Sequence, residues 1–161
     1  MERDRAPHNV WCDLEPIGDG VRGARLLERP TGTRLVSAVW ELDPGGSSGP
    51  YHVHHATEEL MLVLDGTPTL RSPGGERTLE TGDVVHFAIG ARGAHQVLNR
   101  SAKTVRYLMV AAHTGTDVIE YVDEGRVVAY SHRQSALAPD GLFVTHELRN
   151  AEESARRHDR S

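Results

Sequence analysis

Three histidines and one glutamate carry the chemistry that this sequence makes possible. His52 and His54 stand two positions apart, so on an extended strand both side chains point to the same face. Glu59 opens the next apolar run, and His95 opens another further along the chain. Imidazole nitrogens and a carboxylate suit Fe, Ni, Cu, Zn or Mn. The four residues therefore predict one divalent metal ion, and a half-open metal site predicts a small-molecule ligand or substrate.

The elements that must position these residues are short strands separated by turn signals. Gly, Pro, Asp and Ser cluster between apolar segments, for example in Asp43-Pro44-Gly45-Gly46 and Asp65-Gly66. Strands are expected over residues 35–42, 51–54, 60–64, 67–71, 76–80, 84–87, 95–98 and 104–111. Such spacing indicates a sandwich or a barrel, so the fold class is all-β.

The chain divides into a barrel and its flanks. Residues 1–33 are expected to form an N-terminal arm and an entry strand, with Trp11 packed against the domain. Residues 34–113 form the barrel core, and residues 114–146 form a C-terminal hairpin extension with strands over 117–122 and 126–130. Residues 147–161 are expected to be a flexible charged tail.

Composition narrows the class of protein. With 161 residues, 25% charged and 38% hydrophobic, the chain has the make-up of one globular domain. A net charge of −5 and the lack of a dense basic cluster argue against a nucleic-acid partner. No apolar run reaches the length of a membrane span, and the N-terminus has no apolar signal segment. The lone Cys12 suits a reducing compartment, so we expect a cytoplasmic protein.

Two segments resemble the motifs of the cupin superfamily. The run from Gly49 to Gly66 looks like the first motif, and the run from Gly82 through Gly90 to His95 looks like the second, with Ala88 where a proline is usual. The resemblance implies a single-domain, cupin-type jelly-roll β-barrel. It also implies a metal ion inside the barrel, bound by the set His52, His54, Glu59 and His95. Spacing to Gly66 favours Glu59 over Glu58.

A largely apolar substrate pocket is expected beside these ligands. Its predicted lining consists of Met61, Val63, Val97, Tyr107, Trp40, Phe87 and His86. The charged group expected to reach inward is Arg106 or Arg34, with no preference between them. His55 should face away from the ligands, because it follows His54 on the same strand. His113 and His132 lie beyond the barrel and are expected at the surface.

These observations predict a mononuclear metal-dependent enzyme that acts on a small, largely apolar or keto/enol-type substrate. An oxygenase is the preferred class, with Fe the preferred metal and Mn, Ni, Zn or Cu as alternatives. A second hypothesis is a non-redox isomerase or lyase in which Glu59 or a pocket histidine moves a proton. A third is a binding module without catalysis.

The apolar pattern of two strands also bears on how the chain assembles. Residues 60–64 and 104–111 are apolar on both faces, so the outer face of the barrel needs a cover. A homodimer supplies that cover in one interpretation. In the other, the N-terminal arm around Trp11 folds over the same sheet.

Overall fold

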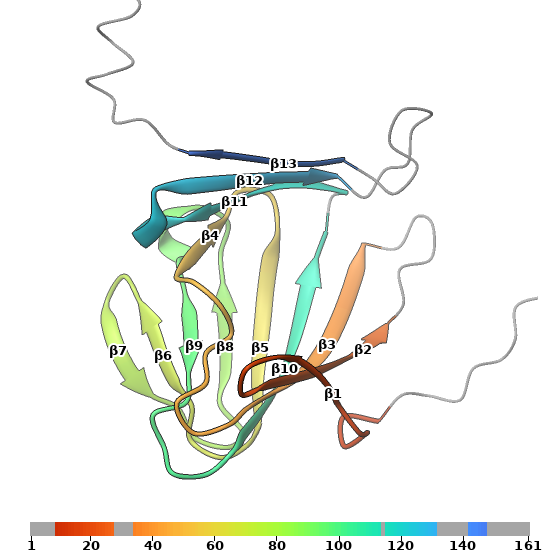
Figure 1. Ribbon diagram of the computed structural model, residues 1–161, viewed down its shortest axis with the longest axis vertical. Coiled ribbons are helices and arrows are strands. Elements are labelled where there is room, and N and C mark those ends of the chain that lie inside the picture. Colours follow the sequence, from red (N-terminus) through yellow and green to blue (C-terminus); the bar gives the residue numbers. More distant parts are fainter. Residues whose placement is uncertain (1–8, 28–33, 114, 132–141, 148–161) are drawn as a thin grey trace, which may run out of the picture.

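The computed structural model describes residues 9–27, 34–113, 115–131 and 142–147, which form three β-sheets (Figure 1). The largest sheet has six strands, in the order β1 (Glu15–Gly18), β2 (Val21–Leu27), β3 (Leu35–Leu42), β10 (Val105–Ala112), β5 (Glu58–Asp65) and β8 (Val84–Phe87). The second sheet has four strands, in the order β13 (Leu142–Glu147), β12 (Arg126–Ser131), β11 (Thr116–Tyr121) and β4 (His52–His54). The third has three strands, β7 (Gly75–Thr78), β6 (Thr69–Ser72) and β9 (Gln96–Leu98).

The all-β prediction is confirmed. Each predicted segment contains a strand, and β3 and β8 have the predicted bounds. The described part of the chain has only two short 3-10 helices, η1 (Ala91–Gly93) and η2 (Val122–Glu124). None of its helices has the length and apolar surface needed to span a membrane.

The flanks of the barrel contain more strands than the sequence predicts. β1 and β2 extend the largest sheet within the segment expected to be an arm with one entry strand. The expected hairpin is β11–β12, and β13 adds a third strand to it. Of the expected charged tail, residues 148–161 lie outside the described residues, and Glu147 is the last residue of β13. Gly and Arg residues hide the apolar alternation of β2, which explains why its extent was not predicted.

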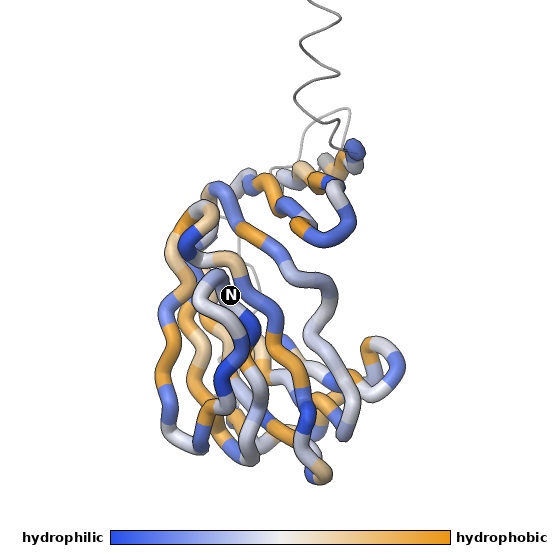
Figure 2. Tube along the Cα trace, turned by 90° about the vertical axis from the view of Figure 1, so that its left-hand side faces the viewer, coloured by the Kyte–Doolittle hydropathy of each residue, from blue (hydrophilic) through white to orange (hydrophobic). Residues whose placement is uncertain are grey.

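The hydrophobic core lies between the six-stranded and three-stranded sheets. Apolar and polar residues alternate along the strands, as the banding in Figure 2 shows. Cross-strand partners on the inner face include Tyr107, Trp40 and Val63. The buried cluster consists of Leu42, Met61, Val63, Leu70, Leu79, Val85, Phe87, Val97, Val105 and Tyr107. This cluster fills the interior and reaches the predicted metal ligands through Phe87, whose ring stacks on that of His95.

The N-terminal segment covers part of the outer face. Arg106 points outward from β10 and donates hydrogen bonds to the carbonyls of Val10 at 2.9 Å and Cys12 at 2.5 Å. The Arg106 guanidinium also lies 5.6 Å from the ring centroid of Trp11, which keeps 59% of its surface exposed. The arm therefore contacts the barrel through Arg106 more than through burial of the indole.

Candidate metal centre

The strand pairing brings the two sequence motifs into direct contact. His52 and His95 pair through their backbones, with N–H···O distances of 3.1 and 2.9 Å. This bridge joins β4 to the segment that leads into β9, so two sheets meet at the centre. His54 follows on the same face of β4, and Glu59 lies near the start of β5.

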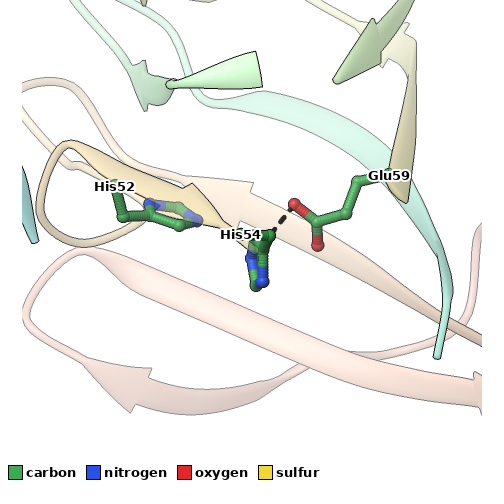
Figure 3. Close-up of side chains that lie close together, drawn as sticks. All are labelled: His52, His54 and Glu59. Atoms are coloured by element: carbon green, nitrogen blue, oxygen red, sulfur yellow. Dashed lines mark ion pairs between the residues drawn. The ribbon is translucent and has the colours of Figure 1, made fainter. Parts of the chain in front are cut away.

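The side chains of these residues converge. His52, His54 and Glu59 each offer a ligand atom within 4.8 Å of the others, and Figure 3 shows His54 and Glu59 pointing toward each other. Glu59 Oε2 lies 3.4 Å from His54 Nε2 and 3.2 Å from His95 Nε2. His95 is almost completely buried, with 2% of its surface exposed. Glu59 thus lies beside both His54 and His95, and His52, His54 and Glu59 form the three-residue cluster whose ligand atoms could share a metal ion; His95 is not part of that cluster.

Each histidine presents the same nitrogen to this centre, because its other nitrogen is occupied. Nδ1 of His52 lies 2.9 Å from the carbonyl oxygen of Pro50, and Nδ1 of His95 lies 2.8 Å from that of Gly93. Nδ1 of His54 lies 2.6 Å from a carboxylate oxygen of Asp117. These oxygens only accept hydrogen bonds, so each Nδ1 carries the proton and each Nε2 presents a lone pair.

This arrangement fits a cation. Glu59 Oε2 is buried and has no hydrogen-bond donor among the described residues, although two histidine nitrogens lie close to it. With the imidazole protons held at Nδ1, the oxygen faces lone pairs, and a buried acceptor in that position is costly. A divalent ion would satisfy the oxygen and the Nε2 atoms together.

The protonation states agree with this interpretation. Burial, followed by repulsion from His95 and His54, lowers the pKa of His52 to about 4, so this imidazole is neutral at neutral pH. Burial by itself raises the pKa of Glu59, but the imidazoles of His95, His54 and His52 outweigh burial and lower it. A neutral His52 imidazole and an ionised Glu59 carboxylate are in the protonation states that metal binding requires.

Asp117 is the residue at this centre that the sequence reasoning missed. It is 1% exposed, and its Oδ1 accepts hydrogen bonds from the N–H groups of Ala56 at 2.7 Å and Val118 at 2.8 Å. Burial by itself would raise the pKa of Asp117. The hydrogen bonds from His54, Thr57 and Ala56 outweigh burial and lower this pKa to about 2. In turn, Asp117 and Glu59 raise the pKa of His54 against the opposing effect of burial. Asp117 therefore makes the His54 imidazole more basic than that of His52, whose pKa is lowered.

A sequence signal for Asp117 exists, but it depends on the strand partner. Ile119 pairs with His54 and Tyr121 pairs with His52, so alternation along β11 places Asp117 on the face of these histidines. An acidic residue on an otherwise apolar inward face is the signal. It could be used only if β11 were known to pair with β4.

A cavity of about 190 Å³ opens beside Glu59. It is lined by Arg25, Leu27, Val36, Ser37, Ala38, Trp40, Glu59, Met109, Ala111 and His113. Of the predicted pocket residues, only Trp40 lies in this lining. Met61, Val63, Val97, Tyr107 and Phe87 belong to the buried core instead. Phe87 also contacts the candidate metal centre, because its ring stacks on that of His95 at a centroid distance of 3.8 Å.

Two predicted inward positions point the other way. His86 pairs with Leu60 across β8 and β5, on the outer face, and its side chain is 58% exposed and lies 3.5 Å from Glu58. The prediction for His86 is therefore wrong by one step of strand alternation, since the next residue, Phe87, faces inward. Arg106 faces the N-terminal segment, as described above. Arg34 is exposed and is not among the residues that line the cavity.

Two cavity residues were not predicted there. Arg25 of β2 lines the cavity, and so does His113, which the sequence places at the surface. His113 Nδ1 lies 3.4 Å from the hydroxyl oxygens of both Thr57 and Tyr130. His132 lies outside the described residues. His55 points away from the centre and lies 3.1 Å from Glu120 at the surface.

Known proteins share this fold. Residues 38–111 match the family model described as "Cupin domain". A solved structure of a sugar phosphate isomerase from a cupin superfamily, from Silicibacter pomeroyi, is similar over 83% of both chains, with 25% identity and a TM-score of 0.68. The polyketide cyclase RemF from Streptomyces resistomycificus is 27% identical over 70% of this chain and 79% of its own, with a TM-score of 0.54. No curated protein is similar enough to count as a match.

A third similar structure is a Cupin 2 conserved barrel domain protein from Salinispora arenicola, which is 26% identical over 71% of this chain and 92% of its own, with a TM-score of 0.54. Strand order, motifs and family model agree that residues 38–111 form a cupin domain. Cupins commonly bind a divalent metal, and His52, His54 and Glu59 form a cluster in this chain that could hold one.

Proposed function

We propose that this protein is a metal-dependent enzyme that catalyses a non-redox isomerase or lyase reaction on a small keto/enol-type substrate. The observation that carries the proposal is the cavity in which the Glu59 carboxylate and the His113 imidazole both take part. Moving a proton between two atoms of a substrate requires a positioned group that can accept and return it. Glu59 and His113 are such groups, and they face the same small volume.

The proposed metal ligands are His52, His54, Glu59 and His95. A bound divalent ion supplies Lewis-acid polarisation of a substrate oxygen. The hydroxyls of Thr57 and Tyr130 hold the His113 ring by its Nδ1 atom. Apolar walls exclude bulk water and leave the substrate facing the proton-carrying groups; they consist of Val36, Ala38, Met109 and Ala111.

The relatives support this class of reaction. The similar structure from Silicibacter pomeroyi is described as a sugar phosphate isomerase, and it aligns with most of this chain. RemF is described as a polyketide cyclase. Isomerisation involves no net oxidation of the substrate, and it is the chemistry that an acid–base pair beside a metal centre performs.

An oxygenase is the second candidate. The apolar cavity walls suit a substrate with little charge, and three imidazoles with one carboxylate suit Fe as well as Mn, Ni, Zn or Cu. The preference for an oxygenase drawn from the sequence thus becomes the alternative here, because it leaves the acid–base groups of the cavity without a role.

One experiment separates these classes. Protein purified without added metal is analysed for bound metal, loaded with Zn²⁺ or Fe²⁺, and incubated in D₂O with hydroxyacetone, 2-ketobutyrate and glyceraldehyde 3-phosphate. Carbon-bound deuterium, followed by NMR, without oxygen uptake supports the proposal. Oxygen uptake that depends on Fe²⁺, without deuterium exchange, supports the oxygenase. Saturable binding with neither reaction supports a binding module.

A matched pair of variants tests the residue roles. His113→Asn removes the proposed proton carrier and should slow exchange by about 10²–10⁴-fold while the metal content stays unchanged. His55→Ala should change neither, because His55 lies at the surface with Glu120. Exchange in His113→Asn at the parent rate would contradict the role given to His113.

We also propose a homodimer in a reducing, cytoplasmic compartment. The N-terminal segment contacts the outer face at Arg106, yet Leu60 of β5 and Val84 of β8 are 41% and 61% exposed on that side. A second copy of the chain would bury them. Light scattering at micromolar concentration should give twice the chain mass, and a single-chain mass unchanged on dilution would contradict the dimer.

A further inference from the structure

We infer that Arg25 makes the cavity selective for small organic oxyanions, either carboxylates or phosphate monoesters. The inference rests on the proposed function only in taking this cavity as the substrate site. It names the substrate class, which neither the sequence motifs nor the metal ligands specify.

The register of the largest sheet places Arg25 opposite the metal centre. Arg25 pairs with Ala38, Ala38 with Met109, and Met109 with Met61, so these residues form one row across β2, β3, β10 and β5. Glu59 lies in the next row of the same face, paired with Ala111. Three steps of about 4.8 Å separate β2 from β5 along the curved sheet. Arg25 and Glu59 therefore stand at opposite sides of one cavity.

Arg25 can bind an anionic ligand because no described residue neutralises its charge. Its neighbour on the same strand, Arg22, forms ion pairs with Glu41 at 3.0 Å and Asp43 at 2.7 Å. Among the described residues, no carboxylate forms an ion pair with Arg25. Among the described residues that line the cavity, Glu59 is the only acidic one, and it belongs to the candidate metal centre on the other side.

The remaining walls define the rest of the ligand. A guanidinium binds carboxylate or phosphate oxygens through paired N–H donors. Between Arg25 and Glu59 the lining is apolar, with the flat indole of Trp40 and the side chains of Met109 and Ala111. A volume of about 190 Å³ lies below the roughly 300–1,000 Å³ usual for drug-sized ligands. The ligand is thus a short molecule, anionic at the Arg25 end and carrying an oxygen donor at the Glu59 end.

Trp40 supplies the readout, since the chain has two tryptophans and the other, Trp11, lies on the outer face. In a Trp11→Phe background, the Zn²⁺-loaded protein is titrated with isobutyrate, methyl phosphate and the neutral isostere isobutyramide while Trp40 emission is followed. We expect saturable changes with at least one anion and about tenfold or more weaker binding of the amide.

Variants assign the preference to Arg25. Arg25→Gln should lower anion affinity by about tenfold and leave amide binding unchanged, and Arg25→Lys should recover part of the loss. Arg77→Gln is the control, because Arg77 lies on β7 of a different sheet. Which anion binds more tightly decides between a carboxylate and a phosphate ester.

The inference is overturned if the amide binds as well as both anions, or if Arg25→Gln retains full anion affinity. Because binding is measured without turnover, failure of the proposed function is distinguishable. Arg25-dependent anion binding without deuterium exchange would remove the isomerase and keep this inference. Deuterium exchange at the parent rate in a protein whose anion binding does not depend on Arg25 would keep the isomerase and remove this inference.

Discussion

The three histidines of the centre are held in two different ways. His52 and His95 each donate Nδ1–H to a carbonyl two residues earlier in their own segment, Pro50 and Gly93. His54 instead donates to Asp117, which lies 63 residues away on β11. Two ligands are thus oriented by short-range backbone geometry, and the third by a buried carboxylate that arrives through sheet pairing.

The two kinds of hydrogen-bond partner respond differently to substitution. A backbone carbonyl orients a ring but cannot be changed in charge by a substitution. Asp117 adds a full negative charge behind His54, which raises the basicity of that one ligand. The C-terminal strands, which the sequence marks only as an extension, therefore take part in the metal centre.

The largest effect should come from removing a short-range ligand. His95→Ala deletes one of four proposed donors and should weaken Zn²⁺ binding by more than about 100-fold, beyond the 10–100-fold typical of losing an outer partner. His55→Ala is the matched control, since it removes an imidazole at the surface. Competition with a chelator of known affinity measures both, and equal losses would show that the ligand assignment is wrong.

The carboxylate behind His54 should come next. Asp117→Ala should lower Zn²⁺ affinity by about 10–100-fold. It should also destabilise the metal-free protein by about 1–3 kcal/mol, because the N–H groups of Ala56 and Val118 lose their acceptor. Denaturant unfolding and metal titration measure the two effects. Unchanged metal affinity would mean that His54 does not need its distant partner.

The loop before His95 tests the histidines that are oriented by a nearby backbone carbonyl, as Asp117 tests the one oriented by a distant carboxylate. A Cβ atom at Gly93 would stand 1.7 Å from the carbonyl oxygen of Ala88, so Gly93→Ala must displace this loop. We expect a loss of about 1–3 kcal/mol in the free energy of unfolding, together with weaker Zn²⁺ binding. Gly74→Ala is the control, because its nearest neighbour would be 3.8 Å away. Parent-like stability of Gly93→Ala would contradict the tight packing of the loop.

Acid should expose the contribution of Asp117 in the metal-free protein. Its folded pKa of about 2 lies below the ordinary value of 3.8, so its stabilisation is present above pH 3.8 and is lost as pH falls toward 2. The loss is at most about 2 kcal/mol. Thermal unfolding between pH 2 and 5 should show a shallower acid dependence in Asp117→Asn than in the parent. Identical slopes would contradict the lowered pKa.

The smallest effect belongs to the outer partner of Asp117. The Tyr130 hydroxyl lies 3.5 Å from Asp117 Oδ2, which is long for a hydrogen bond. Tyr130→Phe should therefore change stability by less than about 1 kcal/mol and leave Zn²⁺ affinity nearly unchanged. Losses of stability and Zn²⁺ affinity as large as those of Asp117→Ala would mean that Tyr130 also controls His54.

The sequence alone was sufficient to predict the strands of the barrel and the common face of His52 and His54. Turn residues between apolar runs mark strand ends locally, and the two-residue spacing of His52 and His54 sets their common face wherever the strand lies. The choice of Glu59 over Glu58 follows from the spacing to Gly66, and Glu58 faces outward toward His86. These features depend on residues close together in the chain.

Only the tertiary structure decided which other residues surround the centre. Asp117 reaches His54 because β11 pairs with β4, and no local pattern names that partner. Arg25 faces the cavity because it pairs with Ala38 of β3, and that register is set by the neighbouring strand rather than by β2 itself. His86 faces outward because a single step of alternation reverses a side chain, so an inward assignment needs the register of the neighbouring strand.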